Sequence, residues 1–284
     1  MWIVWMLLIL AAVFCLLTLF LVCPAFGRRA LRQPFAGRNY AHRGLFTPDQ
    51  SIPENSLPAF EAAVSAGYGI ELDVQFTGDR KLIVFHDDTL DRMTGTHGWV
   101  RDFSWEQVSS MSLAGTQYHP PLFADVLRTV GGRVPLIVEI KSRAEYKGDY
   151  LNALCHAVLD ALDGYDGPWC IESFDPRIVQ RVRKFAPGVL RGQLADCSKG
   201  FRSSGAKALP AFVMSHCLGN FLGRPDFIAW CPAPRNWVIR LNAALGAMMV
   251  NWTALPEYDT AKLEAGYDAV IFQWYAPAPH YGSR

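Results

Sequence analysis

Charged side chains recur at a spacing of two residues near the ends of apolar, strand-like segments of this 284-residue chain: the acidic pair Glu71 and Asp73, and Glu139 with the basic Lys141. Residues two apart on a β-strand project from the same face. Grouped carboxylates repel one another unless a cation compensates them, and carboxylate oxygens are the ligands of Mg²⁺ and Ca²⁺. We therefore predict that Glu71, Asp73 and Glu139 bind one Mg²⁺ or Ca²⁺, with Lys141 facing a substrate anion. The alternative is a set of solvated or salt-bridged rim charges.

Two histidines also follow strand-like segments. His42 stands in AHRG (41–44) and His86 in VFHD (84–87). Two imidazoles beside a divalent cation, with Arg43 next to one of them, suit acid–base cleavage of a phosphoryl ester. The other five histidines lack such a context and are interpreted as packing or surface residues.

Short apolar runs alternate with helix-like segments, which is typical of a parallel sheet covered by helices. Helices are predicted at 56–66, 149–162, 176–185 and 257–265. The predicted strands are 39–42, 69–75, 135–141, 169–173, 189–194, 226–230, 248–252 and 268–272. Eight such units favour an α/β fold of the closed (β/α)8, or TIM-barrel, type. A doubly wound open sheet is the alternative.

One further strand, Lys81–His86, breaks this alternation. It follows the second strand after only a few residues, whereas a parallel crossover needs a dozen or more. The turn-like segment TGDR (77–80) indicates a hairpin instead. Residues 77–120 are therefore predicted to be an insertion after the second barrel strand.

The N-terminal segment 1–23 is predicted to be a membrane-spanning helix. Residues 2–23 carry no charge and are long enough to cross about 30 Å of hydrocarbon. A cleaved signal peptide fits less well, because no basic segment precedes the run and no small-residue cleavage site follows it. Val22 likewise disfavours a lipoprotein site at Cys23. Residues 24–37 are interpreted as a juxtamembrane linker and 38–284 as the barrel.

Charge and cysteine content indicate the compartment and exclude one class of partner. Arg28, Arg29 and Arg32 flank only the C-terminal side of the apolar run, which predicts a single-pass protein with its catalytic domain in the cytoplasm. The cysteines of the barrel are scattered, as is typical of a reducing compartment. The net charge of +1 argues against a nucleic-acid partner.

An ordered set of motifs resembles the glycerophosphodiester phosphodiesterase family. These are AHRG (41–44), PENS (53–56), GIELDV (69–74), VFHDDTLDR (84–92), VEIK (138–141) and SFD (173–175). Each is weak alone, but they occur in order from about residue 39 to 196. The resemblance implies a barrel like that of phosphatidylinositol phospholipase C, with an inserted segment after the second strand.

The same resemblance implies roles for individual residues. Glu71, Asp73 and Glu139 would be the metal ligands, and His42 and His86 the acid–base pair. Arg43 and Lys141 would hold the phosphate, and Glu54 would orient the site. In the last third, NWT (251–253) still resembles the family, so that Trp252 would line the alcohol pocket. The final strand ends in Gln273, where many relatives carry a Thr-Asp pair.

The expected activity is metal-dependent hydrolysis of a small-molecule glycerophosphodiester to sn-glycerol 3-phosphate and an alcohol. A lysophospholipase D acting on membrane lysolipids is an alternative, because residues 212–234 are rich in apolar side chains that could form a rim admitting an acyl chain. The other interpretation of that stretch is a core strand at 227–230. A phospholipase C acting on inositol lipids and a catalytically idle barrel that binds a phosphate-bearing ligand are further alternatives.

Overall fold

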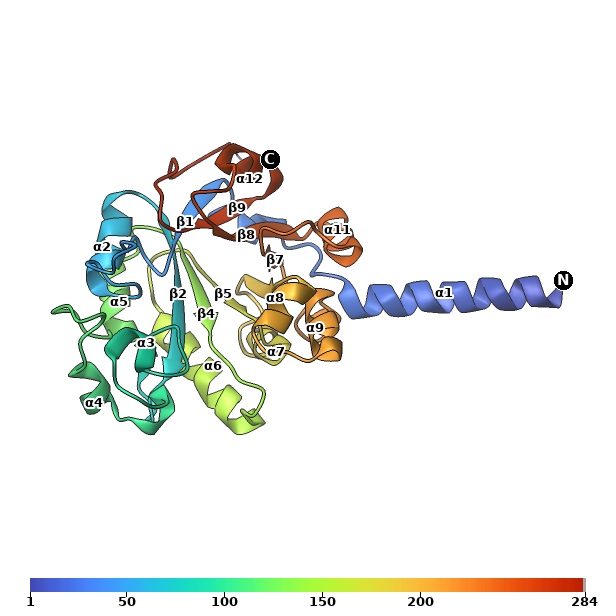
Figure 1. Cartoon of the computed structure of the whole chain (residues 1–284). Coiled ribbons are helices and arrows are strands. Elements are labelled where there is room, and N and C mark those ends of the chain that lie inside the picture. The colour runs from blue at the N-terminus through green and yellow to red at the C-terminus, as the bar shows by residue number, and fades with distance from the viewer. Residues whose placement is uncertain (283–284) are drawn as a thin grey trace.

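The computed structural model of this protein describes residues 1–282, and its centre is a closed barrel of eight parallel strands (Figure 1). The barrel strands are β1 (Arg38–His42), β2 (Gly69–Phe76), β4 (Leu136–Ile140), β5 (Trp169–Ser173), β6 (Arg191–Ala195), β7 (Phe227–Trp230), β8 (Met248–Ala254) and β9 (Ala269–Phe272). Because β1 pairs in parallel with both β2 and β9, the eight-stranded barrel is closed. The predicted (β/α)8 barrel is confirmed, and the open sheet is wrong.

The predicted hairpin is also present. β3 (Leu82–Val84) pairs antiparallel with the end of β2, from Val74 opposite Val84 to Phe76 opposite Leu82. The chain then forms α3 (Asp91–Thr94), η2 (Val100–Asp102) and α4 (Trp105–Ser109). This segment has a small core of its own, made by Ile83, Phe85, Leu90, Met93, Val100, Val108 and Leu113.

The four predicted helices correspond to α2 (Leu57–Ser65), α6 (Gly148–Leu162), α7 (Pro176–Phe185) and α12 (Thr260–Gly266). Capping residues set two of their starts, since Ser56 accepts from the Ala59 N–H and Asp259 accepts from the Lys262 N–H. The second cap explains why α12 starts later than the predicted residue 257. The short helices α5 (Phe123–Val130), α8 (Ser198–Ser203), α9 (Ala208–Ser215), α10 (Asn220–Gly223) and α11 (Trp237–Ala244) were not predicted.

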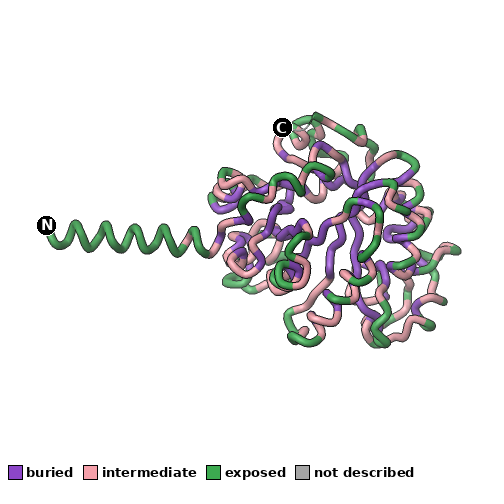
Figure 2. The backbone as a smooth tube through the Cα atoms, turned by 180° about the vertical axis from the view of Figure 1, so that it is seen from behind, coloured by how far each residue is buried: buried purple, intermediate pink, exposed green. Residues whose placement is uncertain are grey.

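The apolar N-terminal segment forms α1 (Trp2–Val22), which projects from the body with almost all of its side chains exposed (Figures 1 and 2). It is long and apolar enough to cross a membrane, a property that it shares with signal sequences. Its C-terminal end contacts α10, where Phe20 meets Phe221 with ring centroids 5.6 Å apart and ring planes tilted by 30°.

Residues 24–37 pack against the end of the barrel at which the strands begin, called the floor below; the opposite end is called the mouth. The Ala25 N–H donates to the Pro225 carbonyl, and Arg28 donates to Asp226 at 2.7 Å and to the Val189 carbonyl at 2.8 Å. These partners precede β6 and β7. After η1 (Arg29–Arg32), the Phe35 ring is buried among the interior side chains of the barrel. The segment is therefore part of the folded body.

Three of the large apolar side chains in the stretch 212–234 do not form a rim at the mouth. Phe227 and Trp230 are buried in β7, as the core-strand interpretation predicts. Phe221 lies on α10 against α1, before β7 begins. The rim hypothesis is therefore wrong for these three residues, because the chain must return to the floor before it can enter the next parallel strand.

Candidate active site

The three predicted metal ligands come together at the mouth. Glu71 and Asp73 project from β2 and Glu139 from the neighbouring β4, with Asp73 directly beside Glu139 in the strand register. One carboxylate oxygen from each lies within 4.8 Å of the others. The Lys141 Nζ lies 3.1 Å from Glu139 and 3.4 Å from Asp73. The strand spacing thus produces the cluster that it predicts.

Burial of these carboxylates makes their simultaneous ionisation unfavourable. Burial and the nearby Asp73 raise the pKa of Glu71 well above its usual range, and burial raises the pKa of Glu139 to about 7. Burial also opposes ionisation of Asp73, but His86, Lys141 and Arg43 outweigh it and hold the Asp73 pKa well below its usual range. The Asp73 Oδ1 is buried and accepts no hydrogen bond, although the Lys141 Nζ lies 3.4 Å away. A hard divalent cation fits this set of oxygens, because it would supply the missing positive charge.

Arg43 is held against this cluster by a tight turn. Its φ of +55° and the φ of +81° at Gly44 reverse the chain after β1. A Cβ at Gly44 would lie 2.9 Å from Ala59 atoms, so only glycine fits there. The Arg43 N–H donates to Glu71 at 3.2 Å, and its guanidinium donates to Glu54 at 2.7 Å. Positive φ at a non-glycine residue is costly and is found preferentially at functional sites.

Glu54 lies at the centre of an ion-pair network. It accepts hydrogen bonds from Arg43 and, through both oxygens, from Arg92 at 2.7 and 2.9 Å. Burial raises the pKa of Glu54, but the two arginines outweigh it and lower the pKa. Glu54 therefore stays ionised and fixes the direction of the Arg43 side chain.

His42 is held in one orientation by Gln273 across the closure of the barrel. The His42 Nδ1 lies 2.5 Å from the Gln273 Oε1, and the Nε2 lies 3.8 Å from Glu71. An amide oxygen only accepts, so the Nδ1 carries the proton and the Nε2 is left with its lone pair. Burial and the neighbouring Arg43 lower the His42 pKa to about 3. The ring is therefore neutral at pH 7, with its basic nitrogen facing the cluster.

His86 follows β3 and is paired with a carboxylate. Its Nδ1 lies 2.6 Å from Asp87, which also accepts from Arg92 at 2.6 Å. Burial and Lys141 lower the pKa of His86, whereas Asp73 and the bond to Asp87 oppose that change. The Gln75 amide donates to the carbonyls of Phe85 and Asp87, on either side of the histidine, at 2.8 Å each. The backbone of the insertion is thus held in place by Gln75 on both sides of His86.

Residues 42–273 match the Glycerophosphoryl diester phosphodiesterase family, with the cluster just described inside the matched region. This chain belongs to that family. A glycerophosphodiester phosphodiesterase of Caldanaerobacter subterraneus subsp. tengcongensis is 29% identical over 241 residues, 81% of this chain and 91% of that protein. A glycerophosphodiester phosphodiesterase of Bacillus subtilis is 30% identical over 201 residues, 63% of this chain and 67% of that protein.

Solved structures show the same fold. A putative glycerophosphoryl diester phosphodiesterase from Silicibacter pomeroyi superposes with a TM-score of 0.69 at 20% identity, covering 86% of this chain and 93% of that one. An Oleispira antarctica phosphodiesterase, solved in complex with the product sn-glycerol-3-phosphate, superposes with a TM-score of 0.65 at 19% identity, covering 84% and 94%. The present chain is a phosphodiesterase of this family and hence a hydrolase.

The wall of the mouth in this phosphodiesterase is aromatic. The Trp252 indole N–H donates to the carbonyls of Ala195 and Ala229, at 3.2 and 3.1 Å. Its ring meets Phe174 edge to face at 5.2 Å. Beside Phe174 lies a cavity of about 460 Å³, also lined by Arg143, Asp175, Arg177 and Met214. Trp252 thus forms part of an aromatic wall near the mouth.

Three side chains that sequence reasoning did not assign lie next to the predicted site residues. Glu172 is a fourth buried carboxylate, beside Glu139 in the strand register, and burial raises its pKa well above the usual range. Asn55 donates to Asp73 at 2.9 Å, and Gln273 orients His42. Glu172 could have been found, because it occupies the same strand-end position as Glu139. The other two depend on contacts between distant segments.

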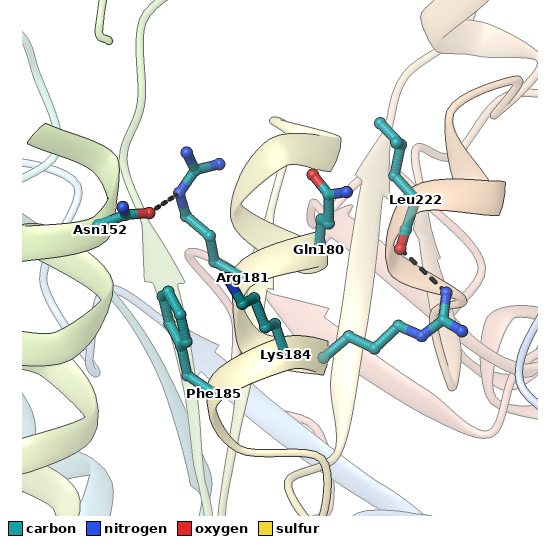
Figure 3. A pocket seen from close by; sticks show the side chains of 7 residues that line it. Asn152, Gln180, Arg181, Lys184, Phe185 and Leu222 are labelled. Carbon is teal, nitrogen blue, oxygen red and sulfur yellow. Dashed lines mark hydrogen bonds between the residues drawn. The ribbon is translucent and has the colours of Figure 1, made fainter. Parts of the chain in front are cut away.

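A separate cavity of about 440 Å³ lies outside the barrel, lined mainly by α7 and also by Asn152 of α6 and Leu222 of α10. Figure 3 shows the side chains that line this cavity. Arg181 donates a hydrogen bond to Asn152, and Lys184 and Phe185 lie on α7. It contains none of the residues described above and is not part of the active site.

Proposed function

We propose that this phosphodiesterase hydrolyses glycerophosphodiesters to sn-glycerol 3-phosphate and an alcohol, with one Mg²⁺ or Ca²⁺ held by Glu71, Asp73 and Glu139. The observation that carries the proposal is the meeting, at one end of the barrel, of three carboxylates, two histidines and two cationic side chains. When bound, the cation would polarise the phosphoryl oxygens and acidify the attacking hydroxyl. The product bound in the Oleispira antarctica structure agrees with this activity.

The side chains divide the remaining steps. His42 accepts at its Nε2 the proton of the attacking hydroxyl, which water supplies, as that oxygen bonds to phosphorus, since the ring is neutral and the Nδ1 is engaged. Arg43 and Lys141 stabilise the charge on the phosphoryl group. His86 in its imidazolium form, with the Nδ1–H held by Asp87, gives its Nε2 proton to the leaving alcohol as the phosphorus–oxygen ester bond breaks. Trp252 and Phe174 provide an apolar surface for that alcohol.

The position of α1 favours a water-soluble substrate over a membrane lysolipid. We propose that α1 is a retained membrane anchor. The chain leaves it at the floor, whereas the catalytic side chains lie at the mouth, one strand length away. A short strand such as β6 spans roughly 17 Å, since each of its residues contributes roughly 3.3 Å. A lysolipid would therefore have to leave the bilayer to reach the site.

The test compares glycerophosphocholine with lysophosphatidylcholine as substrates of the full-length protein and of a protein lacking residues 1–23. We expect kcat/KM to favour glycerophosphocholine by at least about tenfold, equivalent to about 1.4 kcal/mol. Removing α1 should alter both rates by the same factor. Faster cleavage of the lysolipid, with selective loss of that reaction on truncation, would instead support a lysophospholipase D.

We also propose that the catalytic body is cytoplasmic, because Arg28, Arg29 and Arg32 flank α1 only on the side of the body. A reporter fused after residue 284 should then behave as a cytoplasmic protein. A reporter active only outside the cytoplasm would reverse this orientation.

A further inference from the structure

A second group of potential metal ligands lies at the mouth, formed by Asp196, Cys197 and Cys231. Asp196 and Cys197 follow β6, and Cys231 follows β7. These strands are neighbours, with Ala195 paired to Trp230, so the residues that follow them lie side by side. One ligand atom from each of the three side chains lies within 4.8 Å of the others. None of the three belongs to the catalytic cluster.

Each of the two sulfur atoms accepts a backbone hydrogen bond. The Cys197 N–H donates to the Cys231 Sγ at 3.3 Å, and the Gly200 N–H donates to the Cys197 Sγ at 3.4 Å. Hydrogen bonds to a sulfur favour its thiolate form, which is the form that binds a metal. Burial and the Asp196 carboxylate act in the opposite direction and raise the pKa of the Cys231 thiol. A cation between these groups would remove that opposition, since it would neutralise the carboxylate and stabilise the thiolate.

The carboxylate of the group has a fixed place and no cationic partner. The Asp196 Oδ1 accepts from the Cys197 N–H at 2.6 Å. A Cβ at Gly200 would lie 1.9 Å from the Asp196 Oδ2, so the absence of a side chain there leaves room for the carboxylate. Within residues 1–282, no lysine, arginine or histidine forms an ion pair with Asp196. The carboxylate and the two thiols are all potential metal ligands, and a bound cation would supply the positive charge that they lack.

We propose that Asp196, Cys197 and Cys231 bind Zn²⁺ through one carboxylate oxygen and two sulfur atoms, with the fourth position open to water. Thiolate ligands select zinc over the hard cations Mg²⁺ and Ca²⁺, and three protein ligands with an open position are an established zinc arrangement. Binding displaces the proton of each thiol. This site is separate from the catalytic cation and goes beyond the proposed function.

The zinc would order the loop that supports the aromatic wall. Cys197 is the N-cap of α8, and Phe201 on α8 meets Phe174 edge to face at 5.9 Å. Phe174 in turn meets Trp252. A cation joining the ends of β6 and β7 would therefore fix one side of the proposed alcohol pocket.

The experiment measures zinc in the full chain, purified in detergent, by elemental mass spectrometry after exposure to a weak chelator. We expect about one zinc per chain, retained when Glu71→Gln removes a catalytic ligand. Replacing zinc with Co²⁺ should give a thiolate-to-cobalt charge-transfer absorption in the wild-type protein, a readout independent of any variant and of catalysis. Absence of stoichiometric zinc, or of that absorption, would overturn the proposal.

Variants locate the ligands. Asp196→Asn, Cys197→Ser and Cys231→Ser should each weaken zinc binding at least about 100-fold, since losing even an outer-shell partner costs about 10–100-fold. Cys155→Ala, which removes a buried thiol on α6, should retain the zinc. Circular dichroism verifies that each variant is folded. Zinc retained in both serine variants, or an intact mass showing a Cys197–Cys231 disulfide in the wild-type protein, would contradict the site.

Discussion

Glu71→Gln and Glu139→Gln should each lower kcat for glycerophosphodiester hydrolysis by at least about a thousandfold. Metal-assisted stabilisation of phosphoryl oxygens is worth several kcal/mol, and about 1.4 kcal/mol corresponds to a factor of ten in rate. The two side chains supply two of the three converging carboxylates. The measurement is kcat for glycerophosphocholine with saturating Mg²⁺ or Ca²⁺, and for the wild-type protein in excess chelator. Full wild-type activity in chelator would contradict the metal assignment.

Thermal unfolding gives a second, independent readout. Burial raises the pKa of Glu71 and Glu139, so their ionised forms disfavour the folded state above the unfolded-state pKa of about 4.3. At pH 7.5 and without metal, the two glutamine variants should therefore unfold at or above the wild-type Tm. At about 100 times its Kd, the cation should raise the wild-type Tm by about 5–10 °C, since this binding contributes about 2.7 kcal/mol.

Glu172→Gln is the matched control. It removes a buried carboxylate from β5, next to Glu139 in the register but outside the three-ligand group. This variant should keep the cation-induced rise in Tm, whereas the other two should lose it. Equal loss in all three variants would show that the cation site differs from the one proposed.

His42→Ala and His86→Ala should each lower kcat by about 10²–10⁴, the usual contribution of a general acid or base. The double variant should lose less than the product of the two factors, because both act in one transition state. His97→Ala is the matched control, since this exposed histidine lies on the same insertion as His86 and bonds to Asp91, away from the cluster. It should leave kcat unchanged.

A substrate with a better leaving group distinguishes the role of general base from that of general acid. A glycerol phosphodiester of p-nitrophenol has a leaving group that needs no proton, so it should restore most of the rate lost in His86→Ala and little of that lost in His42→Ala. Equal rescue of both histidine variants would contradict the assignment of His42 as base and His86 as acid.

Gln273→Ala should lower kcat about 10–100-fold, as expected for an orienting partner.

The sequence alone predicted the barrel, the hairpin and the charged cluster, because these depend on short-range periodicity. Alternation every two residues places Glu71 and Asp73 on one face, and parallel strands bring Glu139 to the same end. The uncharged run of residues 2–23 predicted a long helix in the same way. Only the direct contact between Asp73 and Glu139 also requires that β4 lies beside β2, which the structure shows.

The tertiary structure decided the contacts that depend on neighbouring strands and on closure. Gln273 reaches His42 because β9 closes onto β1, and Asp196, Cys197 and Cys231 gather because β6 lies next to β7. The segment 24–37 packs on the floor through Arg28 and Phe35, which places α1 and the active site at opposite ends of the barrel. Partners that are distant in the sequence carry no local signal, since packing selects them only after the barrel has closed.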